Sequence, residues 1–158
     1  MTFNTRNGTR GGRQPKAGRL MTWFNTRVAR KVRRNGKFGG MDALVLTTIG
    51  AKSGTERTNP VGFFQPDDES WLIVASAAGA PRNPAWYYNI AAHPERVQIE
   101  LAGRKLPVTA TQLHGAEREE AWRQITAKAP RFAQYQVKTD RELPIIRLTR
   151  RTVTDRTA

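Results

Sequence analysis

The sequence predicts one α+β domain built on an antiparallel β-barrel, with flanking helices and an N-terminal amphipathic helix. Three observations predict it: the strand-like runs are short and closely spaced, tight turns separate them, and few helical patterns interrupt them. A chain of 158 residues is long enough to bury one core of its own. Residues 50–54 read GAKSG, which is neither G-x-G-x-x-G nor a Walker A loop, so a doubly wound nucleotide-binding fold is not expected.

The chain divides into four predicted segments. Residues 1–18 are rich in Gly, Asn and Arg and predict a flexible basic tail. Residues 19–40 predict an amphipathic basic helix followed by a glycine hinge. Residues 41–150 form the barrel domain, and residues 151–158 form a C-terminal tail.

The predicted N-terminal helix covers residues 20–34 and ends at Asn35-Gly36. With a 3.6-residue period, one half of its wheel is apolar and the other carries Arg30, Arg33 and Arg34. The apolar half consists of Leu20, Met21, Trp23, Phe24, Val28 and Val32. An apolar aromatic stripe beside a basic face is typical of helices that lie on a membrane surface, but it equally fits a helix that packs on its own barrel.

The remaining elements follow from alternating apolar patterns and turn residues. Asn83-Pro84 predicts an N-cap with proline at the first helical position, opening a helix that runs to about residue 92. A second helix is predicted over 115–127, and Ala102-Gly103 predicts a tight turn. The predicted strands span 43–49, 57–64, 71–76, 96–101, 105–112 and 144–149.

Charge and composition limit the function classes. The formal net charge is +14, and 11 of the 27 Lys and Arg residues lie in residues 1–40, where there is no acid. The excess charge therefore belongs mainly to the N-terminal part and predicts an anionic partner for it. There is no cysteine and there are only two histidines, so no disulfide and no metal site are predicted. No apolar run approaches the roughly 20 residues of a membrane span, and we expect a cytoplasmic protein.

The most informative stretch is LTTIGAKSGTERTNP, residues 46–60. A strand ends in two threonines, a glycine-flanked loop presents Lys52 and Ser53, and the next strand brings Arg57. Small residues permit close backbone approach, and free N–H groups with two cations suit a phosphate. An ordinary solvated hairpin loop would have the same spacing.

Two further stretches suit a planar ring. LIVASAAG, residues 72–79, is a buried strand that continues as small-residue backbone, on which a flat ring could lie. RNPAWYYN, residues 82–89, combines a helix N-terminus with Arg82 and two aromatics in its first turn. A core strand and core aromatics explain these stretches equally well when each is taken alone.

Taken together, the three stretches resemble the deazaflavin-dependent nitroreductase family, split-β-barrel reductases that use the deazaflavin coenzyme F-420. The shared pattern is T-T-x-G-x-K-S-G-x-x-R-x-N-P, then V-A-S-x-x-G, then N-P-x-W-Y-x-N. The resemblance runs from about Leu20 to Leu148 and includes the late segment R-F-A-Q-Y…T-D-R-x-L-P-I. It implies a split barrel that binds a deazaflavin over residues 41–150.

The resemblance also implies which residues bind the coenzyme. The phosphate and the acidic tail are expected at Lys52, Ser53, Gly54, Thr55 and Arg57, with Asn59 and Pro60 leading the chain back along the coenzyme. Val74, Ala75, Ser76 and Ala77 are expected beside the ring, and Asn83, Ala85, Trp86, Tyr87 and Asn89 close the site. Two departures are present: Ala77 stands where the family often has lysine, and the loop after it is one residue shorter.

The late segment, residues 130–140, matches the region where family members place tyrosines over the substrate. Here Phe132 and Tyr135 are expected to line the substrate pocket, and Ala129 occupies a third such position. The resemblance implies transfer of a hydride from reduced F-420 to an electron-poor acceptor, a quinone or a nitroaromatic compound. Ser76 and Tyr135 are the predicted catalytic residues: Ser76 would hydrogen-bond the acceptor's oxygen, and Tyr135, Ser76 or water would supply a proton.

Three alternatives remain open at this point. An FMN-binding split-barrel oxidase or reductase would share the phosphate and the tricyclic ring. Nucleic-acid binding by the basic N-terminal part belongs to a different class, although no stacking aromatics are interleaved with its cations. Peripheral contact with an anionic membrane surface would place the site near lipid-soluble quinones.

Overall fold

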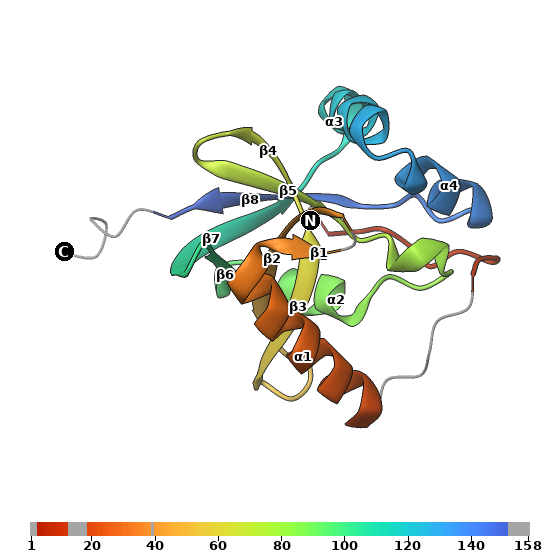
Figure 1. Cartoon of the computed structure of the whole chain (residues 1–158). Helices are drawn as coiled ribbons and strands as arrows, with labels where there is room; N and C mark the ends of the chain where they lie inside the picture. Colours follow the sequence, from red (N-terminus) through yellow and green to blue (C-terminus); the bar gives the residue numbers. More distant parts are fainter. Residues whose placement is uncertain (1–2, 13–18, 39, 152–158) are drawn as a thin grey trace.

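The computed structural model describes residues 3–12, 19–38 and 40–151, with the side chains of residues 19–25 and of Phe38 left out (Figure 1). The helix predicted over 20–34 is α1, Arg19–Asn35. Its last turn leads through Gly36 into β1 (Lys37–Phe38), which pairs with the start of β2 (Met41–Ile49). The hinge predicted at residues 39 and 40 lies partly outside the described residues; β1 and β2 on either side of it pair with each other.

An antiparallel, eight-stranded sheet forms the body of the molecule, as the sequence predicted (Figure 1). Its strand order is β1-β2-β6-β7-β8-β5-β4, and β3 pairs with β2 off this path. The further strands are β3 (Glu56–Gly62), β4 (Phe64–Asp67), β5 (Ser70–Val74), β6 (Val97–Leu101), β7 (Arg104–Gln112) and β8 (Ile145–Arg150). The predicted turn at Ala102-Gly103 has φ values of 53° and 77°, which match a tight hairpin.

Both faces of β2 are buried, and this places α1. Leu44 and Leu46 point into the main core, whereas Ala43 and Val45 pack with Ala29 and Val32 of α1. Successive residues of a strand alternate between faces, so an unbroken apolar run can serve the barrel and the helix at once. The described apolar side chains of α1 thus pack on the protein's own barrel, and α1 belongs to the domain.

The predicted strand over 57–64 is two strands with a break at Phe63. Its first half, β3, pairs only with β2, so Pro60 removes a donor from an edge strand, where the loss is tolerated. The second half, β4, turns away to pair with β5. The backbone N–H of Phe63 donates to Asp42 O at 3.0 Å, which fixes the break against the start of β2.

Besides α1, the described residues form four helical elements, two between β5 and β6 and two between β7 and β8. The predicted helices are α2 (Ala85–Ala92) and α3 (Gly115–Lys128). The 3-10 turn η1 (Ala77–Gly79) and the helix α4 (Arg131–Lys138) were not predicted from the sequence. In Figure 1, α3 and α4 lie together at one end of the sheet, and η1 lies against α4.

Residues 3–12 differ most from the sequence prediction, because a flexible tail was expected there. The segment runs beside η1 and α4 (Figure 1) and is bound along its length. Gly8 N donates to Pro81 O at 2.7 Å and Gly12 N to Gly79 O at 2.9 Å. Phe3 packs edge-on against Tyr87, with ring centroids 5.9 Å apart. We call residues 3–12 the N-terminal strap.

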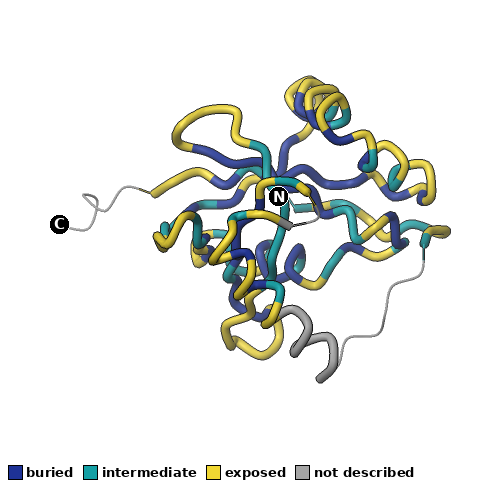
Figure 2. The backbone as a smooth tube through the Cα atoms, viewed as in Figure 1, coloured by how far each residue is buried: buried dark blue, intermediate teal, exposed yellow. Residues whose placement is uncertain are grey.

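The buried residues follow the inner strands and α2, and the loops carry the exposed surface (Figure 2). The main core gathers side chains from β2, β5, β6, β7, β8 and α2. A second core lies under α3 and α4. Within the part of the chain that the structure describes, no helix is long and apolar enough to cross a membrane.

Candidate active site

The loop between β2 and β3 presents its charges to solvent. Lys52, Ser53, Gly54, Thr55 and Arg57 are all exposed, and the loop forms one tip of the molecule (Figure 2). Among the described residues, neither Lys52 nor Arg57 forms an ion pair. We call residues 50–57 the cationic loop; the resemblance had assigned the phosphate to it.

The cationic loop is fixed by its own backbone and by α2. Gly54 N donates to Gly50 O at 2.9 Å, and Gly50 N donates to Thr55 O at 2.8 Å. Asn89 of α2 accepts from Ala51 N at 3.0 Å and donates to Thr48 Oγ1 at 3.1 Å. Asn89, predicted to close the site, is therefore a buried bridge that sets the position of the loop.

A second loop, residues 75–83, leads from β5 to α2 and contains a strained turn. Ala77, Ala78 and Gly79 have φ values of 47°, 53° and 80°. This left-handed region costs an L-residue roughly 1–2 kcal/mol, so two alanines in it need support from their surroundings. We call residues 75–83 the ring loop, because Ala75, Ser76 and Ala77 were predicted to lie beside the ring.

Gly79 lets the ring loop approach α4 closely. A Cβ atom built on Gly79 would lie 2.6 Å from Tyr135 O and 3.1 Å from Lys138 Cβ. Only a residue without a side chain fits there. This contact brings Ser76 and Tyr135, the two predicted catalytic residues, onto neighbouring elements, and both side chains are half-buried.

Arg141 holds the ring loop from the inside and was not among the predicted site residues. Its side chain is 2% exposed. The guanidinium donates to Ala75 O at 3.0 Å, Ser76 O at 2.9 Å, Ala80 O at 3.1 Å and Asn83 Oδ1 at 2.5 Å. It stands in the T-D-R-x-L-P-I segment, whose sequence does not reveal that the arginine points inward.

The prediction that Asn83 caps α2 is wrong. Pro84 occupies the N-cap position and no side chain caps the helix, because Asn83 faces the other way. Its Oδ1 accepts from Arg141 and its Nδ2 donates to Thr5 O at 3.3 Å. Asn83 is 4% exposed and connects the ring loop to the N-terminal strap.

Trp86 and Tyr87, predicted to close the site, lie in the main core. They are 7% and 2% exposed. The hydroxyl of Tyr87 donates to Gln112 Oε1 at 2.7 Å and accepts from Thr5 N at 3.1 Å. Ala85, by contrast, is exposed at the start of α2. The structure thus gives the two aromatics a packing role and leaves Ala85 accessible.

The residues predicted along the coenzyme on β3, at the end of β5 and at the start of the ring loop are half-buried or buried. Asn59 and Pro60 are half-buried on β3. Val74 is buried at the end of β5; Ala75, the first residue of the ring loop, is also buried, and its N–H donates to Pro144 O at 2.9 Å. Among the described residues β3 pairs only with β2, so its other edge has no strand partner.

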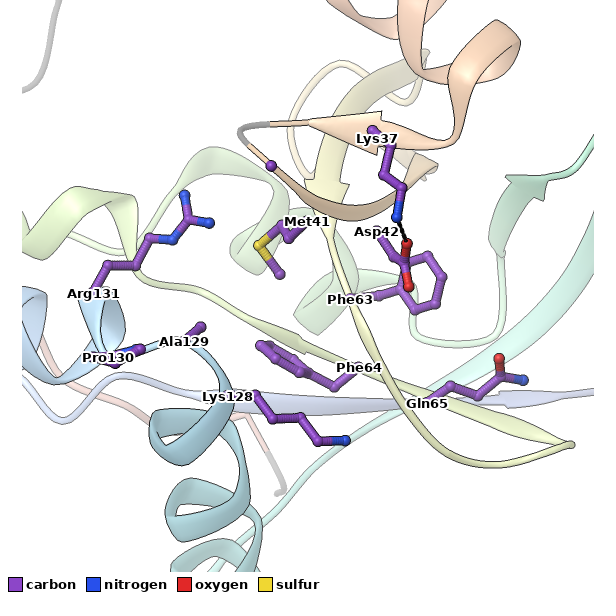
Figure 3. Close-up of a pocket in the computed structure, with 11 residues that line it drawn as sticks. Lys37, Met41, Asp42, Phe63, Phe64, Gln65, Lys128, Ala129, Pro130 and Arg131 are labelled. Atoms are coloured by element: carbon purple, nitrogen blue, oxygen red, sulfur yellow. Dashed lines mark hydrogen bonds and ion pairs between the residues drawn. The ribbon is translucent and has the colours of Figure 1, made fainter.

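A pocket of about 610 Å³ opens between the β1–β2 hairpin, the β3–β4 break and the α3–α4 corner (Figure 3). Met41, Phe63, Phe64 and Ala129 supply apolar walls. The polar lining comes from Lys37, Asp42, Gln65, Lys128 and Arg131, and Lys37 Nζ lies 2.5 Å from Asp42 Oδ1. Of these residues, only Ala129 was singled out from the sequence.

The pocket adjoins the two aromatics that were predicted to line it. Phe132 is 8% exposed and packs edge-on against Phe64, with ring centroids 6.0 Å apart. Phe132 also meets Tyr135 at 5.8 Å. A continuous aromatic row therefore runs from the pocket wall at Phe64 to Tyr135, next to the ring loop.

Two residues that follow one another carry shifted pKa values. The hydroxyl of Thr9 donates to Asp140 Oδ2 at 2.5 Å and, with the backbone N–H groups of Thr9 and Arg10, lowers the pKa of Asp140 from 3.8 to about 2. Burial lowers the pKa of Arg141 from its usual value. Asp140 thus binds the strap outside the domain, while Arg141 binds the ring loop inside it.

Residues 18–150 match the model of the F420H(2)-dependent quinone reductase family. The chain belongs to this family. A protein of Mycobacterium tuberculosis (strain ATCC 25618 / H37Rv) named as an F420H(2)-dependent quinone reductase is 37% identical over 116 residues, 72% of this chain and 76% of that protein. A second protein of the same strain, a putative F420H(2)-dependent quinone reductase, is 33% identical over 65% of this chain and 85% of its own length.

Solved structures agree with the fold. An F420-H2 dependent reductase, FDR-A, superposes with a TM-score of 0.60 at 37% identity, covering 67% of this chain and 92% of that one. ChuZ of Campylobacter jejuni shares only the fold, with a TM-score of 0.52, 14% identity and coverage of 86% and 63%. The split-barrel architecture and the family expected from the resemblance are confirmed.

The residues present fit the coenzyme on which the family depends. Lys52 and Arg57 are exposed cations without ion-pair partners among the described residues, as a phosphate and an acidic tail require. A Cβ atom on Gly54 would meet nothing within 4 Å, so the loop offers open space beside those cations. Ala85, where the ring loop enters α2, and Asn89, which holds the cationic loop, are four residues or about 6 Å apart along the helix.

Proposed function

We propose that this protein reduces quinones with reduced coenzyme F-420, binding the coenzyme between the cationic loop and the ring loop. One observation supports it most: Asn89, in the middle of α2, holds the cationic loop, while the ring loop leads into the start of the same helix. A coenzyme with an anionic chain and a planar ring matches these two loops in chemistry. When bound, reduced F-420 supplies a hydride from its ring.

In this proposal the protein's own residues bind, orient and exclude water. Lys52, Ser53, Gly54, Thr55 and Arg57 bind the anionic part, and the edge of β3 at Asn59 and Pro60 follows the coenzyme. The backbone of the ring loop, with Ala85 beyond it, faces the ring. Placing the acceptor against the reacting carbon is the main contribution, which agrees with the absence of a strong acid–base constellation in the sequence.

The acceptor is placed in the pocket next to Phe64 and Ala129. Its aromatic walls suit a planar quinone, and its polar rim suits an acceptor that is partly exposed to water. The quinone takes up a hydride and a proton to become the hydroquinone; Tyr135, Ser76 or water provides the proton. Electron-poor nitroaromatic compounds have the same flat shape, and we propose them as secondary acceptors.

Titration of the coenzyme-free protein tests the assignment. Tryptophan fluorescence would be followed while oxidised F-420, reduced F-420 and FMN are added separately, and turnover would then be measured with quinones and nitroaromatics. We expect low-micromolar binding of F-420, weak binding of FMN and faster reduction of quinones. Tight FMN binding would favour the split-barrel oxidase alternative. If neither F-420 nor FMN binds, the result would favour the alternative in which the basic N-terminal part binds nucleic acid.

The role of Ser76 predicts a separation of two kinetic quantities. Its Oγ makes no hydrogen bond to the described part of the chain, so Ser76→Ala should leave the fold and the affinity for F-420 nearly unchanged. Loss of one hydrogen bond to the acceptor would lower kcat/KM roughly tenfold. Steady-state kinetics and a coenzyme titration on the same preparation check this. An equal loss of affinity and turnover would contradict the role.

Contact with an anionic membrane surface remains a proposal with a narrower basis. Ala29 and Val32 are used by the barrel, whereas Arg30, Lys31 and Arg34 are exposed. Trp23 and Phe24 lie outside the described side chains. Removing α1 would uncover β2, so charge reversal (Arg30→Glu, Lys31→Glu, Arg34→Glu) is the better variant. It should weaken sedimentation with anionic liposomes, and equal sedimentation would end the idea.

A further inference from the structure

Arg141 is a buried cation with an unusual set of partners. Its side chain is almost fully buried, yet no acidic side chain in the described part of the chain lies within ion-pair distance of it. Its neighbour Asp140 faces the strap instead. Burying a cation without a carboxylate is costly, so every donor of the guanidinium must find an acceptor elsewhere.

All the acceptors come from the ring loop. Three are backbone carbonyls, of Ala75, Ser76 and Ala80, and the fourth is the side-chain oxygen of Asn83. They bracket the turn at Ala77 and Ala78, where two alanines adopt positive φ. A planar guanidinium with donors in fixed directions can hold several acceptors at once, which a lysine ammonium cannot do with the same geometry.

The N-terminal strap binds the same loop through other carbonyls. Gly12 N donates to Gly79 O and Gly8 N to Pro81 O. A Cβ atom on Gly11 would lie 2.5 Å from Gly79 O, so the strap runs directly against the loop backbone. Since the loop carries strain, these contacts oppose its relaxation, and Arg141 makes the larger number of them.

We propose that Arg141 is a positioning residue for quinone reduction: its guanidinium keeps the ring loop in the conformation that presents Ser76 and Ala77 to the coenzyme. The inference rests on the proposed function for its catalytic meaning. Arg141 itself is buried beneath the loop and acts through the loop backbone.

Arg118 provides a matched control. It is also a buried arginine, 6% exposed, and it donates to a backbone carbonyl, Leu143 O, at 2.8 Å. Its other contacts are with Trp122, Glu119 and Glu142, and none is in the ring loop. Arg141→Met and Arg118→Met therefore both remove a buried guanidinium, but only the first releases the ring loop.

Hydrogen exchange of the coenzyme-free proteins is the first measurement, made well below the Tm of each variant. We expect amides of residues 76–80 to exchange at least tenfold faster in Arg141→Met and within about twofold of wild type in Arg118→Met. Exchange is read without coenzyme, so it tests the hold on the loop even if the proposed function fails. Unchanged exchange in Arg141→Met, or equal acceleration in Arg118→Met, would overturn the proposal.

Coenzyme titration and kinetics are the second measurement. The Kd for F-420 should rise roughly tenfold or more in Arg141→Met, with kcat also lower, and stay within about threefold in Arg118→Met. Arg141→Lys keeps the charge but not the planar fork, and should lie between wild type and Arg141→Met. Wild-type affinity and turnover in folded Arg141→Lys and Arg141→Met would overturn the proposal, whereas a wild type that does not bind F-420 would overturn the proposed function.

If the Arg141 variants do not fold, the wild-type protein still tests the proposal. Exchange in the wild-type protein then serves as the test, with the cationic loop as an internal reference. The proposal requires amides of residues 77–80 to be protected well beyond those of residues 51–55, although both segments are turns. Equal exchange in the two loops would overturn it.

Discussion

The cationic loop and the ring loop are held in opposite ways, although both face the same proposed ligand. The cationic loop is closed by its own backbone and touches the rest of the protein through Asn89. The ring loop is strained, and its carbonyls are bound by Arg141 from inside and by the N-terminal strap from outside. One loop presents charges to solvent, and the other presents backbone in a fixed shape.

This difference matches the two kinds of recognition that each loop is proposed to perform. An anionic chain can be bound by exposed cations that adjust to it, so rigidity adds little there. Hydride transfer, in contrast, depends on the position of the ring to a fraction of an ångström. The long-range contacts from Arg141 and the strap are made to the ring loop, whose geometry would decide the rate of hydride transfer in the proposed function.

The largest effect is expected from removing the charges of the cationic loop. Lys52→Ala combined with Arg57→Ala should weaken F-420 binding roughly 100-fold, because two charge-assisted contacts are lost. The Tm should stay unchanged, since both side chains are exposed and form no ion pair with the described residues. Fluorescence titration and thermal unfolding measure the two quantities.

Arg104→Ala with Lys105→Ala is the control for this double variant. These cations lie exposed at the β6–β7 turn, away from both loops. If they weakened binding as much as the loop variant did, the effect would come from net charge and the cationic loop would lose its special role.

How far the sequence predicted each loop follows from where its contacts lie. The glycines and charges of GAKSG and Arg57, from which phosphate binding was predicted, could be read locally, because charge and glycine spacing are local properties. The ring loop was recognised by its small residues. Its support comes from Arg141, which lies 58 to 66 positions further along the chain than the loop residues it binds. No local pattern distinguishes a buried Arg141 from the exposed arginines around it.

The strap shows the same limit more clearly. Residues 3–12 have the composition of a flexible tail, and composition predicted one. Most of what binds them is hydrogen bonding: backbone N–H groups of the strap donate to Pro81 O, Tyr87 Oη and Asp140 Oδ1, and Thr5 Oγ1 accepts from Gln112 Nε2. Contacts made by glycine and threonine leave no apolar pattern in the sequence, so hydrophobic periodicity could not reveal them.

The second prediction concerns the link between the cationic loop and α2. Asn89→Ala should destabilise the protein by about 1–3 kcal/mol, because Ala51 N and Thr48 Oγ1 lose their partner. F-420 affinity should fall roughly tenfold as the loop shifts. Tyr88→Phe removes a hydrogen bond to Asn7 from the same helix and should leave affinity unchanged. Normal F-420 binding in Asn89→Ala would mean that the loop needs no anchor.

The third prediction separates the strap from the ring loop by pH. Since the folded pKa of Asp140 is about 2, below its unfolded value of 3.8, its stabilising contribution is complete above about pH 4 and is lost as the pH falls toward 2. Hydrogen-exchange protection of residues 8–10 should fall across this window. In Asp140→Asn that protection should be several-fold lower at neutral pH and nearly flat between pH 4 and 2. A wild-type profile as flat as the variant's would contradict the role of Asp140.

The smallest effects should come from one substitution in each loop, glycine to alanine in the cationic loop and alanine to glycine in the ring loop. Their effects on stability should have opposite signs. Gly54 has φ +71° and open space around it, so Gly54→Ala adds left-handed strain; the lower entropy of the unfolded alanine chain offsets part of it, and a net destabilisation of about 0.5 kcal/mol is expected. Ala78, exposed at φ 53°, already carries that strain, so Ala78→Gly should give a net stabilisation of about 0.5 kcal/mol after the same entropic offset. Urea unfolding resolves both changes. Destabilisation by Ala78→Gly would show that the alanine stiffens the ring loop by more than its strain costs, which would make the turn itself, and not only Arg141 and the strap, part of what holds the loop in place.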